Sequence, residues 1–160
     1  MVFRTLKKRG KVSKILKEKS GQDAIIEIDN FLLPLFRKNP GRLTREEKTI
    51  IFIEEYEREV NNGGFHQFYY NSAGDYFYEI VESLKRIKSS KFLFFLLKSQ
   101  TPFPNSEIPK DRVKRQKILE EIEYEAEELW RNIELEFYKY EEDINKLIVE
   151  YILANIEHFR

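Results

Sequence analysis

The stretch EVNNGGFHQFYYNSAG, at residues 59–74, decides how this chain folds because it interrupts an otherwise helical pattern. Before it, residues 44–60 carry apolar side chains every three or four positions, which is the spacing of one helix face. The Asn and Gly residues at 61–64 can adopt the left-handed backbone conformation that ends a helix. A short helix is expected to restart at Phe65 and to end before residue 72. The stretch therefore predicts a tight corner between two helices.

The corner also gathers polar side chains among aromatic ones, and two interpretations of it remain open. In the structural interpretation, the asparagines cap helix ends, the glycines allow close backbone approach and the aromatic residues fill the core. In the functional interpretation, the corner is a small polar pocket whose free N–H groups at the new helix start could hold an anion. The candidate site residues are Asn61, Asn62, Gly63, Gly64, His66, Gln67 and Asn71.

Helical spacing of apolar residues continues on both sides of the corner, and no strand-like alternation competes with it. Thr44 and Glu47 form a capping box at the start of the helix before the corner. Asp75 is expected to cap the helix after it. Further helices are predicted over residues 23–37, 75–87, 91–99, 111–138 and 144–159. The predicted fold class is all-α, a single compact domain of about six or seven helices.

The N-terminal segment differs from the rest in charge. Residues 1–19 contain eight Lys/Arg and one acid, with few apolar residues, and predict a basic arm or a marginal amphipathic helix ahead of a helical domain at residues 20–160. Residues 1–45 carry a net charge of +8, residues 46–110 of −2 and residues 111–160 of −6. Such asymmetry is typical either of charged partners or of a basic arm lying against acidic helices.

Several classes of function are excluded by composition. The chain has no cysteine and only two histidines, His66 and His158, so neither thiolate chemistry nor a three-histidine metal site can form within it. Phosphate-binding glycine loops are absent, and Tyr70 stands where a nucleophile elbow around Ser72 needs glycine. We therefore expect no cofactor, no metal and no catalytic residue. The longest apolar run has six residues, too few to span a bilayer, which predicts a soluble protein. The absence of cysteine suits a reducing compartment, and we expect a cytoplasmic location.

A second candidate site is the run of eleven acids between residues 120 and 143. Acids spaced along a helix can imitate the phosphates of DNA for a DNA-binding partner, although an ordinary solvated helix face has the same composition. Direct DNA reading by a helix-turn-helix at the corner is not expected. The would-be recognition helix at residues 65–71 lacks Lys and Arg and follows four glutamates, which repel phosphate.

The corner stretch resembles the signature of the bacterial DNA-mimic-protein family, Glu-Val-Asn-Asn-Gly-Gly-Phe-x-Gln-Phe-Phe-x-Asn-Ser-x-Gly. Here Tyr69 takes the place of the second Phe. The likeness extends over residues 43–159 and includes Ser83-Leu84, Phe103-Pro104, the LEFY run at 135–138, Asp143-Ile144 and Tyr151-Ile152.

This resemblance implies a helical fold and, by analogy with the family's named member, a dimer that imitates DNA and binds a transcription factor. The chain departs from that member in having zero net charge and a basic N-terminal third. We expect a non-enzymatic interaction protein whose acidic face binds a basic DNA-binding regulator. That face would comprise Glu120, Glu121, Glu123, Glu127, Glu128 and Glu134.

Two alternatives belong to other classes of function. The first is a small-ligand-binding or enzymatic protein that uses the polar corner. The second is an accessory nucleic-acid binder that uses the basic side chains of the arm, Lys7, Lys8, Arg9, Lys11 and Lys14.

Overall fold

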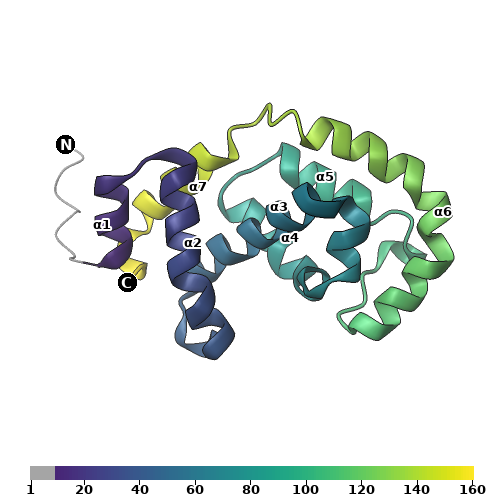
Figure 1. The fold of residues 1–160 in the computed structure, drawn as a ribbon, viewed down its shortest axis with the longest axis horizontal. Helices are drawn as coiled ribbons and strands as arrows, with labels where there is room; N and C mark the ends of the chain where they lie inside the picture. Colours follow the sequence, from purple (N-terminus) through teal and green to yellow (C-terminus); the bar gives the residue numbers. More distant parts are fainter. Residues whose placement is uncertain (1–9) are drawn as a thin grey trace. The chain divides into compact units, whose positions relative to one another are not determined.

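The computed structural model describes residues 10–160, and every regular element in this range is helical (Figure 1). The seven α-helices are α1 (Lys11–Glu18), α2 (Gly21–Lys38), α3 (Arg45–Tyr70), α4 (Phe77–Arg86), α5 (Lys91–Ser99), α6 (Arg112–Phe137) and α7 (Ile144–Ala154). Short 3₁₀ turns span Pro40–Arg42, Ser72–Tyr76, Pro104–Ser106 and Ile156–His158. The predicted all-α class is confirmed. Within residues 10–160, no helix is both long and apolar enough to cross a bilayer.

The contacts of the chain define two compact units. The first contains the residues up to Ile51 together with Asp143–Arg160, and the second contains Phe52–Glu142. The chain passes from the first unit to the second within α3. The boundary that the sequence places after residue 19 stays a prediction. Of the basic side chains assigned to the arm, Lys7, Lys8 and Arg9 lie outside the described residues.

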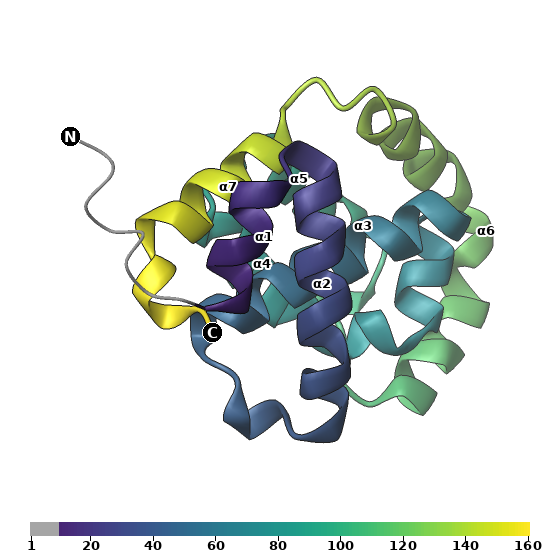
Figure 2. The same ribbon diagram turned by 60° about the vertical axis from the view of Figure 1, so that its left-hand side comes forward.

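In the first unit, α1 and α7 both pack against α2 (Figures 1 and 2). Residues 11–18 form a helix rather than a loose arm, and the burial of Val12 and Ile15 stabilises it. The C-terminus lies beside this helix, where the N–H of Val12 donates to the carbonyl of Arg160 at 3.0 Å. Lys11 and Lys14, also in α1, are exposed.

The start of α3 confirms the predicted capping box. The N–H of Glu47 donates to Thr44 Oγ1 at 3.1 Å, and the N–H of Thr44 donates to Glu47 Oε2 at 3.0 Å. The buried Glu47 carboxylate also accepts from Arg160 Nε at 2.8 Å. This ion pair satisfies a carboxylate that would otherwise be costly to bury.

The second unit is built around aromatic side chains from α3, α5 and α6. Phe137, near the end of α6, packs edge-on against Tyr56 (5.6 Å between ring centroids), Phe65 (6.4 Å) and Phe92 (4.9 Å). Edge-to-face pairs of this kind add about 0.5–1.5 kcal/mol each beyond the area they bury. This aromatic core anchors the corner of α3 against α6, so it positions both candidate sites.

Candidate functional site

The corner of α3 is a backbone kink at two glycines. Helical geometry is lost at Gly63 (φ −159°, ψ 22°) and at Gly64 (φ 70°, ψ −170°). The positive φ of Gly64 lies in the region that side chains disfavour. A Cβ at this position would also lie 2.3 Å from Oε1 of Glu134. Glycine is therefore required at residue 64 both by its backbone conformation and by the close approach of α6.

The helix that restarts after the kink receives a carboxylate from the chain itself. The N–H of Phe65 donates to Glu134 Oε1 at 2.8 Å. Burial raises the pKa of Glu134, and this hydrogen bond opposes that rise. The N–H that the sequence offered to an external anion is thus already occupied. Glu134 consequently lies half-buried at the corner rather than with the exposed acids of α6.

A second carboxylate links the two sides of the kink. Glu59, on the helix before the glycines, accepts from Gln67 Nε2 at 3.1 Å and from Asn71 Nδ2 at 2.8 Å. The side chain of Gln67 lies close against Gly63, since a Cβ at residue 63 would be 2.1 Å from Oε1 of Gln67. The polar residues of the stretch therefore bond to one another, which favours the structural interpretation of the corner.

The remaining asparagines of the corner have different surroundings. Asn61 Nδ2 donates to the hydroxyl of Tyr140 at 2.7 Å, and that hydroxyl donates to Glu57 Oε1 at 3.0 Å. Asn62 is exposed. Burial raises the pKa of Glu57 to about 7, although the hydrogen bond from Tyr140 opposes the rise.

This raised pKa makes a pH-dependent prediction. Unfolded Glu57 loses its proton near pH 4.5 and folded Glu57 near pH 7, so its contribution to stability is complete below pH 4.5 and is lost as pH rises to about 7. Glu57→Gln should therefore be more stable than the wild type at pH 8, by on the order of 1–3 kcal/mol, and equally stable at pH 4. Urea unfolding across this pH range measures the difference. If the difference in unfolding free energy between wild type and variant does not change with pH, the raised pKa of Glu57 is contradicted.

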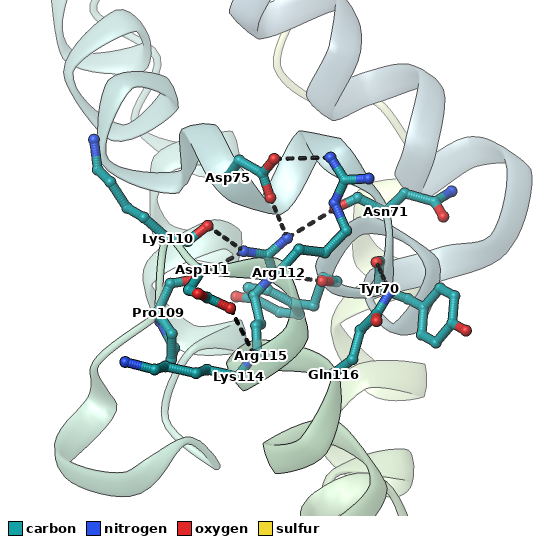
Figure 3. Close-up of polar contacts among 11 residues, drawn as sticks. Tyr70, Asn71, Asp75, Pro109, Lys110, Asp111, Arg112, Lys114, Arg115 and Gln116 are labelled. Atoms are coloured by element: carbon teal, nitrogen blue, oxygen red, sulfur yellow. Dashed lines mark hydrogen bonds and ion pairs between the residues drawn. The ribbon is translucent and has the colours of Figure 1, made fainter.

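Arg115 of α6 is a buried cation that the sequence pattern did not single out (Figure 3). Its guanidinium contacts Asp75 Oδ1 at 2.6 Å. It also donates at 2.6–3.3 Å to four backbone carbonyls, those of Tyr69, Asn71, Pro109 and Lys110. The bond to Tyr69 satisfies a carbonyl in the last turn of α3, and the others tie Asn71 and the segment before α6 to the same guanidinium. A Cβ at Gly74 would lie 2.6 Å from Arg115 Nε, so the last glycine of the stretch makes room for this side chain.

The capping role predicted for Asp75 is wrong. No side chain caps the start of α4. Asp75 instead lies in the 3₁₀ turn before it, paired with Arg115 and with Arg112, whose Nη2 donates to Asp75 Oδ2 at 2.9 Å (Figure 3). Burial would raise the pKa of Asp75, but the hydrogen bonds from the two arginines hold it below its usual value. The ion pair outcompetes the cap because a buried guanidinium needs a compensating charge.

The acidic residues of α6 divide into two groups. Five of the six predicted face residues are exposed along the helix: Glu120, Glu121, Glu123, Glu127 and Glu128. The opposite stripe is buried at Ile122, Ala126 and Ile133, as expected. Leu129 is only half-buried, and its place in the core is taken by Trp130, whose Nε1–H donates to the carbonyl of Ser99 at 2.8 Å.

One corner residue and two face residues meet at a hollow of about 290 Å³. It is lined by His66, Glu123, Tyr124, Glu127 and Trp130. His66 Nε2 lies 3.3 Å from Glu123 Oε2 and its ring stacks on Tyr70. Trp130 and Tyr124 were not among the predicted site residues, although the single Trp of the chain, four positions after Ala126, falls on the same helical stripe. Across residues 10–160 there is no cluster of three or more potential metal-ligating side chains.

Comparison with known proteins identifies one family. A family model described as DMP19-like protein matches residues 41–155, a range that contains the corner and all of α6. This match agrees with the resemblance to DNA-mimic proteins at the level of the family. No curated protein and no solved structure matches the chain.

Proposed function

Because the chain belongs to the family of DMP19-like proteins, we propose that it is a non-enzymatic interaction protein that binds a basic DNA-binding protein through α6. The exposed acids Glu120, Glu121, Glu123, Glu127 and Glu128 form the binding surface, which we call the acidic face. The acidic face binds the positively charged surface with which the partner otherwise contacts the phosphates of DNA. The partner cannot bind DNA and this protein at the same time, so this protein would release its partner from DNA.

The observation that carries the proposal is that most of these acids form no ion pair with a basic side chain of the described residues. Within residues 10–160, neither Lys nor Arg forms an ion pair with Glu120, Glu121, Glu127 or Glu128, whereas acids elsewhere are commonly paired, as Glu79 is with Lys110. Unpaired carboxylates on consecutive turns, about 5–6 Å apart along the helix, sum to a continuous negative potential. Such a potential attracts and orients a basic partner.

The alternative of a small-ligand site at the corner receives less support. Its polar groups are engaged with one another through Glu59 and Tyr140, and its helix start is occupied by Glu134. The accessory nucleic-acid binder rests on side chains that lie partly outside the described residues. The resemblance to a dimeric family member also makes a homodimer part of this proposal, for which sedimentation velocity is the direct measurement.

The proposal is tested by affinity capture from a lysate of the cells that express the protein. A variant with Gln at Glu120, Glu121, Glu127 and Glu128 should fold normally, because exposed charges contribute little to stability. It should capture at least about tenfold less partner than the wild type, because the attraction depends on the summed charge. Duplex DNA added to the wild-type complex should displace the partner, since both occupy one surface.

A matched control separates the acidic face from net charge. Replacing Glu18, Glu82, Glu107 and Glu150 with Gln removes the same number of exposed acids from outside α6. This control should retain capture at low salt and lose it as salt rises, because the screening length shortens to about 8 Å at physiological ionic strength. Capture that survives the α6 substitutions, or that duplex DNA does not displace, would contradict the proposed function.

A further inference from the structure

The hollow beside the corner is large enough to admit one amino-acid side chain. Its volume of about 290 Å³ is at or below the lower end of the range for pockets that bury drug-sized ligands. The side chains that line the hollow are of two chemical kinds, carboxylates and aromatic rings. Glu123 and Glu127 lie one helical turn apart and supply carboxylates, whereas Tyr124, Trp130 and His66 supply aromatic rings.

This combination selects for a planar cation. Anions are repelled by the two carboxylates, and an apolar side chain would leave both carboxylates desolvated without a partner. A cation gains from the carboxylates and from the face of an exposed aromatic ring, which here is the ring of Tyr124, since Trp130 is only 3% exposed. A guanidinium gains most, because it can bond a carboxylate through two N–H groups while its plane stacks on an aromatic ring. An ammonium is a compact, strongly hydrated charge that can do neither.

The hollow also continues the acidic face defined above. Glu123 and Glu127 belong to both, so a basic surface attracted to α6 is brought directly to its rim. Among the described contacts, Glu123 uses Oε2 toward His66, which leaves Oε1 for an incoming donor. Tyr124 is 88% exposed, so its ring is available to cover a side chain that enters from solvent.

We propose that this hollow is an arginine-specific subsite, in which the partner inserts one arginine side chain between Glu123, Glu127 and the exposed ring of Tyr124. The inference rests on the proposed function, because it names the anchor of the same basic partner. It goes further by stating that recognition is selective for guanidinium over ammonium, rather than for positive charge alone.

The experiment compares oligo-arginine and oligo-lysine peptides of equal length and charge, with affinity measured by calorimetry. Trp130 is the only tryptophan, so its fluorescence reports occupancy of the hollow directly. The wild type should bind the arginine peptide about fivefold or more tightly than the lysine peptide, and only the arginine peptide should change the Trp130 emission. Glu123→Gln/Glu127→Gln should reduce this preference to less than about twofold. Tyr124→Ala should weaken it by removing one ring.

The matched control is Glu120→Gln/Glu121→Gln, which removes the same charge from the same helix outside the hollow. It should lower the affinity for both peptides equally and leave the arginine preference unchanged. Equal wild-type affinity for the two peptides, or a preference that survives Glu123→Gln/Glu127→Gln, would overturn the subsite while leaving the acidic face in place. Failure of the wild type to bind either peptide at low salt would overturn the proposed function itself.

Discussion

Replacing Arg115 with methionine is expected to destabilise the second unit by about 3–5 kcal/mol, the cost of breaking a buried ion pair from one side. The substitution removes the Arg115 hydrogen bonds to four backbone carbonyls and the buried charge that faces Asp75. Methionine fills much of the same volume, so the loss is mainly electrostatic. Urea unfolding followed by Trp130 fluorescence measures it within the same unit.

Arg112→Met is the matched control for this prediction. Arg112 bonds the same carboxylate at 2.9 Å, but its side chain is 46% exposed and water can replace it. Its loss should therefore cost no more than about 1 kcal/mol. If the two variants unfold at the same urea concentration, Arg115 does not hold the corner and α6 together.

Gly64→Ala is expected to cost about 2–4 kcal/mol, for two reasons that can be separated. Alanine is strained at the φ of +70° that residue 64 adopts, and its Cβ would displace the carboxylate of Glu134 from the N–H of Phe65. Gly21→Ala isolates the first reason, because Gly21 has a φ of +54° and a methyl group added there would meet no neighbouring side chain within 4 Å. It should cost only about 1–2 kcal/mol.

Glu134→Ala isolates the second reason when it is combined with Gly64→Ala. The double variant should be less destabilised than the sum of the two single variants, because removing the carboxylate also removes the clash. Far-UV circular dichroism during urea unfolding follows all three variants. Additive costs, or a Gly64→Ala variant as stable as Gly21→Ala, would show that the approach of α6 does not require glycine here.

Most helices could be predicted from the sequence because their signals are local. Apolar spacing located α6 to within a residue at each end, and Thr44 with Glu47 marked the start of α3. The two glycines of the corner were likewise identified as a break. Each of these features depends on residues within one or two helical turns of each other, because apolar spacing and backbone preference determine where a helix forms and where it breaks.

The partners of polar groups could not be predicted in this way. Glu134 belonged to the acidic run by composition, yet it bonds the N–H of Phe65, 69 positions earlier in the chain. Arg115 lies in a charged segment that is typical of a solvated surface, yet it is fully buried. Both outcomes depend on contacts that α6 makes with the second half of α3 and the residues after it, which are far from α6 in the sequence.

The sequence by itself determined the helical class, the corner and the concentration of acids toward the C-terminus, since periodicity and composition contain this information. Tertiary structure alone decided that five acids stay exposed on α6, while Glu134 turns to the corner. It also brought His66 beside Glu123 and Glu127 to form one hollow. The physical reason is desolvation: whether a charge is buried with a partner or left for another molecule depends on neighbours that are distant in sequence.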